Sequence, residues 1–251
     1  MYTGSPHTYT DWRETMPYRT ILFDADNTLM DFSRSEHDAL WDCLVARGLP
    51  CNDAIIARYA AINDEFWKML ERGKIEREAL RVGRFAKFIQ EFGFACDPQA
   101  LADDYMAALS TKSYLMDGAL ELCQNLYGKC RLYLITNGNT RVQEGRFNPS
   151  PLAPLFEDVF ISENMGCAKP EKAYFDAVAT RIPHFDPADT LVVGDSLTSD
   201  IQGGINAHLA TCWYNPYSKP VPAGMPIDYV ARTFPEIQAI ILGEYGSPNF
   251  H

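Results

Sequence analysis

The chain has 251 residues, of which 47% are apolar and 22% charged, values typical of a globular protein with one large domain or one domain plus a substantial insertion. The formal net charge of −11 argues against a nucleic-acid polymer or an anionic membrane surface as partner. It leaves room for a small phosphorylated substrate, because a metal ion and a few local cations can override the global sign.

The cysteines and the chain start bear on the compartment. The seven cysteines are an odd count, with no C-x-x-C pair and no His/Cys cluster of zinc spacing, so we expect reduced and mostly buried thiols. Residues 1–17 are polar and mixed, which indicates a poorly fixed arm and no signal peptide. No apolar run reaches the roughly 18 residues of a membrane span. We therefore expect a cytoplasmic protein without a membrane partner, and the oligomeric state stays open.

An apolar strand and a helical block come first along the chain. The strand begins at Thr20 and ends in two acids, Asp24 and Asp26. After it, Ser33 and Glu36 have the spacing of a capping box, in which Ser33 accepts from the helix start and Glu36 reaches back. Further helices are predicted at about 53–72, 75–91 and 98–112, the last capped by Asp97. With no strand among them, these four helices indicate an inserted cap whose apolar stripes form its own core.

From residue 117 onward, strands and helices alternate. The predicted strands are 131–136, 159–162, 190–195, 210–214 and 228–231, and the predicted helices are 119–127, 140–146, 171–181, 199–207 and 235–242. Such alternation predicts a parallel sheet covered on both faces. The expected fold class is therefore α/β: a Rossmann-like core formed by residues 1–32 and 114–251, with an all-helical cap domain formed by residues 33–113.

The two acids after the first strand suggest chemistry. Asp24 and Asp26 are two apart on an extended segment, so their side chains point the same way. Two like charges at such a short distance repel each other, which raises the free energy unless a cation or a shared proton offsets the repulsion. The pair therefore asks for a divalent metal, or for one acid that works protonated. Taken alone, it is equally compatible with ordinary polar residues in a turn.

Three further motifs follow in order: T-N-G at residues 136–138, K-P at 169–170 and G-D-S-x-x-x-D at 194–200. Singly, they indicate a turn, a solvated lysine and a helix-capping acid. Together with D-x-D-x-T at residues 24–28, the ordered set resembles the haloacid dehalogenase superfamily of phosphohydrolases. The hydrolytic dehalogenases of that superfamily lack the second acid. Asp26 therefore favours a phosphate ester, because an alkoxide leaving group needs a proton and a halide does not.

The resemblance implies a role for each acid. Asp24 would be the nucleophile that forms an aspartyl-phosphate. Asp26 would be the general acid and then the base, and its backbone carbonyl would also ligate the metal. Asp195 would complete a Mg²⁺ site with Asp24, since Mg²⁺ prefers hard oxygen ligands. Asp200 would either touch the metal through water or anchor Lys169.

The phosphate contacts follow from the same resemblance. Thr136 and the backbone amide of Asn137 would hold a phosphoryl oxygen, because a strand end that leads into a helix offers free N–H groups. Lys169 would neutralise charge on the transferring phosphoryl group. Thr28 would stabilise the turn after the first strand.

Longer stretches at residues 161–170 and 193–213, and a cap pattern over 62–85, look like the pyrimidine 5′-nucleotidase branch. This likeness implies hydrolysis of nucleoside 5′-monophosphates with pyrimidine bases, including modified ones. Asn27, where glutamate or glycine is expected more often, departs from the pattern at a non-catalytic position. The alternatives are a sugar-phosphate or phosphoglycolate-type phosphatase, a phosphomutase, or a non-catalytic binding module.

The cap sequence contains candidate residues for substrate contact, but it does not determine which of them contact the substrate. Arg77, Arg81 and Arg84 are spaced to share one face of the third cap helix. Such a face would meet phosphate or base edges if it looked into the cleft, and Trp67 would stack on a base. For Arg77 and Arg81 we favour a solvated face. For Arg84 and Trp67, substrate contact and a structural role are both left open.

Overall fold

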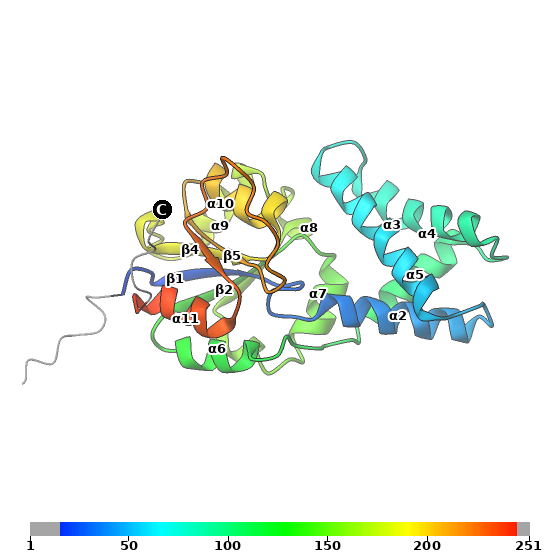
Figure 1. Ribbon diagram of the computed structural model, residues 1–251, viewed down its shortest axis with the longest axis horizontal. Coiled ribbons are helices and arrows are strands. Elements are labelled where there is room, and N and C mark those ends of the chain that lie inside the picture. The colour runs from blue at the N-terminus through cyan, green and yellow to red at the C-terminus, as the bar shows by residue number, and fades with distance from the viewer. Residues whose placement is uncertain (1–15, 245–251) are drawn as a thin grey trace, which may run out of the picture.

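The computed structural model describes residues 16–244, so most of the arm predicted at residues 1–17 lies outside the described residues. Figure 1 shows a sheet covered by helices, with a separate group of helices beyond one end of it. Within the described part of the chain, no helix is long and apolar enough to cross a membrane.

The sheet has six parallel strands in the order β3-β2-β1-β4-β5-β6. They are β1 (Thr20–Asp24), β2 (Arg131–Thr136), β3 (Asp158–Ile161), β4 (Thr190–Gly194), β5 (Ala210–Tyr214) and β6 (Tyr229–Ala231). The chain builds outward from β1 to β3 on one side and then from β4 to β6 on the other. The strand order therefore reverses between β1 and β4, and open α/β sheets bind ligands at such a switch point.

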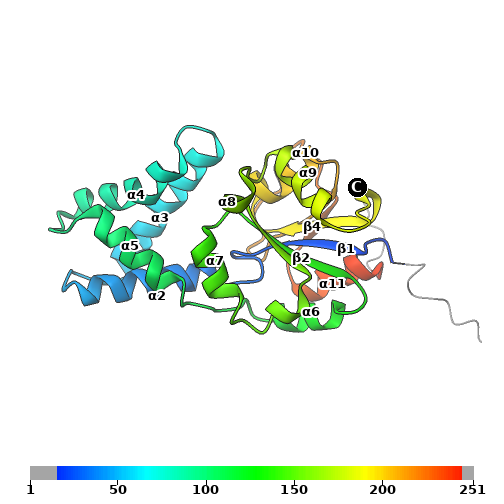
Figure 2. The same ribbon diagram turned by 180° about the vertical axis from the view of Figure 1, so that it is seen from behind.

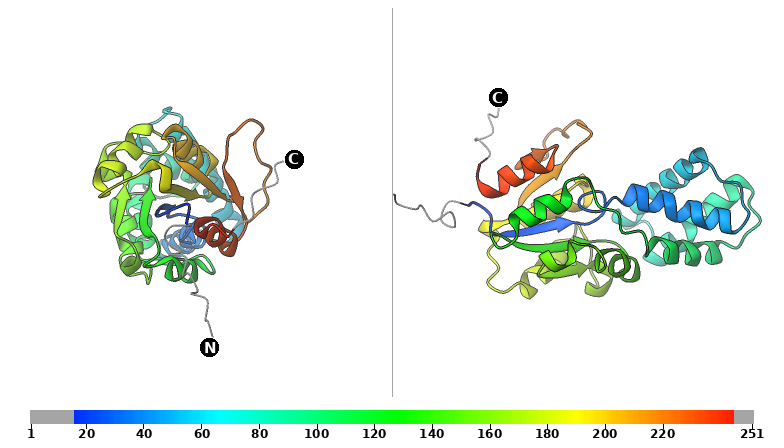
Figure 3. Two further views of the ribbon diagram at one scale, coloured as in Figure 1. Left: turned by 90° about the vertical axis from the view of Figure 1, so that its left-hand side faces the viewer. Right: turned by 90° about the horizontal axis from the view of Figure 1, so that it is seen from below.

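Apolar side chains bury both faces of the sheet, as the alternation of strands and helices predicted. Ile21 and Phe23 of β1 pack into a cluster with α6 (Ala119–Leu126) and α11 (Phe234–Leu242). Leu22 joins the opposite cluster, which includes residues of α9 (Lys172–Arg181). Figures 2 and 3 show α6 and α11 on one side of the strands, with α9 and α10 (Gln202–Asn206) on the other. The predicted α/β class is confirmed.

The inserted helices are α2 (Phe32–Ala46), α3 (Asp53–Glu71), α4 (Arg77–Phe92) and α5 (Pro98–Leu109). They share one apolar cluster rich in aromatic rings, in which Tyr59 contacts Phe85, Phe88 and Tyr105. Val142 of α7 (Thr140–Phe147) also joins this cluster, so α7 links the two bodies. The Asp97 cap predicted for α5 is present, and its side chain accepts from the Ala100 amide.

The predicted capping box at the start of α2 is wrong. Asp31 caps the helix instead, accepting from the Arg34 amide at 2.8 Å. Ser33 lies inside the first turn and donates to the Asn27 side chain. Glu36 is buried and contacts α3. An acid two residues earlier therefore provides the cap, which leaves Glu36 available for tertiary contacts.

Short elements also differ from the prediction. Ser162, expected at the end of a strand, opens the one-turn helix α8 (Ser162–Met165). The single helix expected at 199–207 is a π-helical turn, η3 (Leu197–Ile201), followed by α10. Two further short turns are η1 (Ala153–Leu155) and η2 (Pro187–Asp189). All seven cysteines are free, and four of them are buried, as expected.

The hydroxyl of Tyr174, buried on α9, donates to the backbone carbonyl of Phe160 in edge strand β3 at 2.6 Å. Tyr174→Phe removes this buried hydrogen bond, so we expect a loss of about 1 kcal/mol in the free energy of unfolding. Denaturant titration would measure it. Tyr217→Phe is the control, because Tyr217 is 76% exposed. Equal shifts for both variants would contradict the assigned role.

Candidate active site

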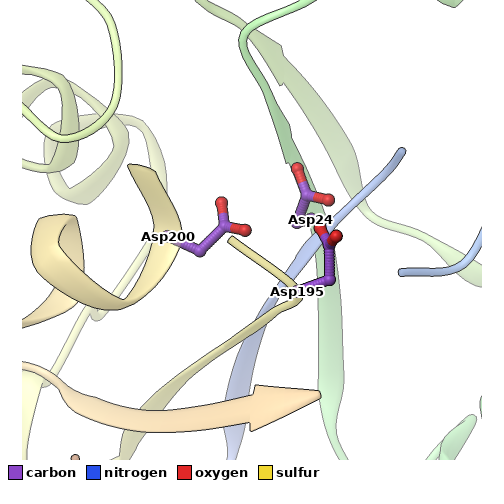
Figure 4. Close-up of side chains that lie close together, drawn as sticks. All are labelled: Asp24, Asp195 and Asp200. Carbon is purple, nitrogen blue, oxygen red and sulfur yellow. The ribbon is translucent and has the colours of Figure 1, made fainter. Parts of the chain in front are cut away.

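Acidic side chains gather where the strand order reverses. Asp24 ends β1 and Asp195 directly follows β4, and these two strands are paired neighbours. Asp200 comes from η3, five residues after Asp195. Figure 4 shows the three carboxylates turned toward one another beyond the strand ends. One side-chain oxygen from each lies within 4.8 Å of the other two. All three residues were among the site residues predicted from the sequence.

Asp24 and Asp195 are costly to ionise where they lie. Burial raises the pKa of Asp24 well above its ordinary value, the charges of Asp200 and Asp195 add to the rise, and Lys169 opposes it. Burial, with Asp200 next, raises the pKa of Asp195 to about 7. An ionised Asp24 therefore depends on positive charge close by.

Lys169 supplies the positive charge that the structure shows. Its buried ammonium donates to Asp24 Oδ1 at 2.6 Å, to Asp200 Oδ1 at 2.7 Å and to the backbone carbonyl of Ile135 at 3.1 Å. Burial lowers the pKa of Lys169, but attraction to Asp200 and Asp24 outweighs burial and raises the pKa above its ordinary value. All three ammonium protons thus have partners, and a phosphoryl oxygen would have to replace one of them.

The donor set fits a divalent cation. Three carboxylates face one ammonium, so negative charge exceeds positive charge in a site with raised acid pKa values. Carboxylate oxygens are the ligands that Mg²⁺ prefers, with water and substrate phosphate completing its shell. Asp24 and Asp195 have carboxylate oxygens that could hold such an ion. Asp200 is already bonded to Lys169 and to the Ser196 amide.

Asp26 has a different environment from Asp24. Arg146 Nη1 donates to Asp26 Oδ1 at 2.5 Å, and Gln143 Nε2 donates to Asp26 Oδ2 at 2.6 Å. Both partners lie on α7 and are buried, Arg146 completely. The side chain of Asp26 is not one of the three clustered carboxylates. The two acids of the D-x-D motif are therefore held by separate sets of partners.

Gln143 and Arg146 were missed by the sequence analysis. They are three apart on α7, a spacing that places both on one helix face. Arg146 also donates to the backbone carbonyl of Lys112 at 3.2 Å and approaches Ser35 Oγ at 3.4 Å. It thereby joins Asp26 to both chain segments that connect the cap to the core. The one feature of the sequence that could have indicated Gln143 and Arg146 is their spacing of three residues on a helix that follows the T-N-G motif.

The turn after β1 fixes Asp24. Thr28 donates to Asp24 Oδ2 at 3.0 Å and accepts from the Asp195 amide at 3.1 Å, so it ties the nucleophile candidate to β4 as well as stabilising the turn. Asn27 has a φ of +61°, a left-handed conformation that asparagine tolerates better than most residues. The departure from the family pattern at Asn27 therefore has a conformational reason.

The T-N-G motif positions other groups. Thr136 Oγ1 accepts from the Gly138 amide at 3.0 Å and from Gln143 Nε2 at 3.1 Å. The Asn137 side chain makes a reciprocal pair with the Lys169 backbone, donating to its carbonyl at 2.8 Å and accepting from its amide at 2.9 Å. The Asn137 side chain, which the prediction did not use, thus holds the segment that carries Lys169.

Gly194 leaves space for Asp200. A Cβ atom at Gly194 would lie 2.2 Å from Asp200 Oδ2, so a larger residue there would force Asp200 to move. The glycine of the G-D-S-x-x-x-D motif therefore allows Asp200 to lie over the end of β4.

A cavity of about 620 Å³ extends from these acids to the cap. Its lining includes Asp24 and Lys169 on the core side and Trp67 and Arg84 on the cap side. The cap touches the core across it: Thr198 donates to Oε2 of Glu71, the last residue of α3, at 2.8 Å.

The solvated interpretation of Arg77 is wrong. Arg77 is half-buried and donates to the Asn137 carbonyl at 3.2 Å and to Ser162 Oγ at 2.6 Å, both on the core. Arg81 agrees better with that interpretation, since it pairs with the exposed acids Glu78 and Asp103. The environments of the two arginines differ because the start of α4, where Arg77 lies, faces the core rather than solvent.

Arg84 is buried within the cap. It donates to Asn63 Oδ1 at 2.5 Å, and Asn63 donates to Glu36 Oε1 at 2.6 Å. Glu36 and Asn63 also line the cavity, and the sequence analysis assigned neither to the site. Helical spacing alone did not show that polar residues from three helices meet inside the bundle.

Known proteins resemble this chain over most of its length. Residues 18–208 match a family model described as haloacid dehalogenase-like hydrolase. Over 203 residues the chain is 39% identical to pyrimidine 5′-nucleotidase PynA of Streptococcus pneumoniae, covering 80% of this chain and 86% of that one. Pyrimidine 5′-nucleotidase YjjG of Escherichia coli is 30% identical over 226 residues, covering 90% and 99%.

A solved structure of similar fold contains magnesium. The HAD-hydrolase YfnB of Bacillus subtilis, bound to magnesium and described as revealing interdomain movement, superposes with a TM-score of 0.85 at 39% identity. The superposition covers 89% of this chain and 98% of YfnB. The four motifs meet at one sheet edge, and the family model covers them together, so this chain belongs to the haloacid dehalogenase-like hydrolase family, as its motifs predicted.

Proposed function

We propose that this hydrolase is a Mg²⁺-dependent phosphomonoesterase that forms an aspartyl-phosphate on Asp24 and acts on pyrimidine nucleoside 5′-monophosphates. The observation that carries the proposal is the placement of the two acids. Asp24 is bonded to Lys169 among clustered carboxylates, whereas Asp26 is bonded to Arg146 and Gln143. The names of the relatives PynA and YjjG support the substrate class.

The two acids divide the reaction between them. Asp24 attacks phosphorus, an O–P bond forms, and the ester P–O bond breaks as Asp26 gives its proton to the departing alkoxide oxygen. Asp26 then takes a proton from water, which attacks the phosphoryl group and frees Asp24.

Phosphate contacts come from the T-N-G turn. The Thr136 oxygen already accepts two hydrogen bonds, so its own hydroxyl hydrogen is directed to another acceptor, which we assign to a phosphoryl oxygen. The Asn137 backbone amide follows Thr136 and is assigned the same role. Lys169 balances the charge on the transferring group. A bound Mg²⁺, held by Asp24, Asp195 and the Asp26 carbonyl, would supply further positive charge to the phosphate oxygens.

The cap is proposed to hold the leaving group. We divide the chain into a core of residues 1–32 and 114–251 and a cap domain of residues 33–113. Trp67 and Arg84 line the cap side of the cavity, where a nucleoside attached to a phosphate over Asp24 would lie. We assign Trp67 to stacking on the base and Arg84 to its polar edge.

Substrate choice and metal use are tested by phosphate release from pyrimidine and purine nucleoside monophosphates, sugar phosphates and phosphoglycolate. We expect uridine, deoxyuridine and thymidine monophosphates to be hydrolysed well ahead of the others with Mg²⁺ present. EDTA and Asp24→Asn should each abolish turnover, because the nucleophile and its charge balance are lost. A preference for sugar phosphates would overturn the nucleotide assignment, and activity in Asp24→Asn would overturn the mechanism.

The role of Asp26 is tested with leaving groups of different basicity. In Asp26→Asn we expect uridine monophosphate turnover to fall by roughly a hundredfold or more, the usual size of general acid catalysis. p-Nitrophenolate leaves without a proton, so p-nitrophenyl phosphate should give a fast burst of about one equivalent before slow turnover. Rapid quench would record it. Asp176→Asn, an exposed ion-paired acid on α9, is the control, and absence of the burst would contradict the assignment.

A further inference from the structure

A polar cluster lies inside the otherwise apolar cap. It consists of Glu36 from α2, Asn63 from α3 and Arg84 from α4, which are 6%, 3% and 4% exposed. All three line the cavity that reaches Asp24. They therefore form a part of the cap wall that faces the substrate space while packing within the bundle.

Several hydrogen-bond donors and one acceptor of this cluster have no partner among the described residues. Asn63 bridges the two charged residues, donating to Glu36 Oε1 at 2.6 Å and accepting from Arg84 Nη1 at 2.5 Å. The second Glu36 oxygen receives no bond from the described residues. Of the five N–H donors of Arg84, one meets an oxygen, one meets Met106 Sδ at 3.8 Å, and Nε has no partner within residues 16–244.

Such a cluster costs the cap stability. A buried carboxylate and guanidinium that do not touch directly gain little from each other and lose their hydration. The buried hydroxyls of Tyr59 and Tyr105, which pack in the same bundle core, also lack partners among the described residues. Apolar side chains would fill the bundle at lower cost, so the unused donors and acceptor indicate that a ligand completes the cluster.

The pattern of donors and acceptors selects the ligand group. A carboxylate oxygen beside a guanidinium with free N–H groups complements a ring that offers one N–H beside a carbonyl oxygen. Uracil and thymine present this pattern at N3–H and the flanking carbonyl groups, whereas cytosine has no hydrogen on N3. Burial raises the pKa of Glu36 to about 7, and Arg84 and Asn63 limit the rise, so the accepting carboxylate form is populated above neutral pH.

We propose that Glu36 and Arg84, held in place by Asn63, form a subsite that reads the N3–H and carbonyl edge of uracil or thymine. Glu36 accepts from N3–H, and Arg84 donates to an adjacent carbonyl oxygen. Asn63 is the positioning residue, because both ends of its amide are occupied by its neighbours. The inference rests on the proposed nucleotidase function and names the part of the base that the cap recognises.

The subsite is tested first from the substrate side. We compare kcat/KM for uridine monophosphate, uridine monophosphate methylated at N3, cytidine monophosphate and p-nitrophenyl phosphate. A hydrogen bond to a charged acceptor supports a loss of about tenfold or more on N3 methylation, with cytidine monophosphate also below uridine monophosphate. This comparison uses the natural chain, so its result does not depend on whether a variant folds.

The variant Glu36→Gln tests the residue itself. It should lower the kcat/KM ratio of uridine monophosphate to p-nitrophenyl phosphate by about tenfold, mainly through KM, and should narrow the effect of N3 methylation. Glu91→Gln, an exposed acid of α4 that pairs with Arg58, is the matched control and should leave both ratios unchanged.

The outcomes separate the two proposals. A wild type that prefers uridine monophosphate but ignores N3 methylation overturns the subsite and leaves the nucleotidase function standing. Equal losses on both substrates in Glu36→Gln likewise overturn it, since a merely structural role would produce them. A wild type that cleaves p-nitrophenyl phosphate but no pyrimidine nucleotide overturns the proposed function and the subsite together.

Discussion

The contact between Lys169 and the buried carboxylates of Asp24 and Asp200 is the constraint on which the site depends. Parallel strands deliver acids to one edge of the sheet, and burial there raises the pKa of Asp24 and Asp195. A nucleophile must nevertheless be ionised. One ammonium, fixed by three acceptors, offsets part of this charge, and the excess that remains makes the site receptive to a divalent cation. Repulsion among the carboxylates destabilises the cluster when no cation is bound. A divalent cation would relieve this repulsion and would also attract the phosphate group of a substrate.

Environment, rather than residue type, separates the two aspartates of the D-x-D motif. They are two residues apart on one segment, but Asp24 faces Lys169 and Thr28 while Asp26 faces Arg146 and Gln143. Acid and base roles require such separation, because two equivalent carboxylates would titrate as one coupled pair. Helix α7 therefore belongs to the site as much as the strand ends do, although it carries none of the recognised motifs.

The sequence predicted what depends on local pattern. The strands and the motif residues Asp24 and Asp195 were predicted because apolar runs end in polar groups, and parallel strands must end at one edge. Lys169 was predicted only through the resemblance of its K-P motif to the family pattern. Contacts between distant segments were missed. Nothing near Glu36 shows that Asn63 will approach it, and the capping-box spacing there gave a wrong local explanation. Arg77 and Arg81 have similar neighbours in sequence, and only the position of α4 relative to the core distinguishes them.

The cap meets the core at the places where the chemistry is held. At the tip of the cap, Glu71 contacts Thr198, which lies between Asp195 and Asp200, and Arg77 contacts the carbonyl of Asn137, whose side chain holds the Lys169 backbone. At its base, Arg146 connects Asp26 to the segments that join cap and core. These contacts are polar, and Val142 of α7 adds an apolar contact by packing in the cluster of the cap, so a shift of the cap would disturb both kinds of contact. The position of the cap and the arrangement of Asp26, Asn137 and the Asp195–Asp200 segment are therefore linked through these contacts.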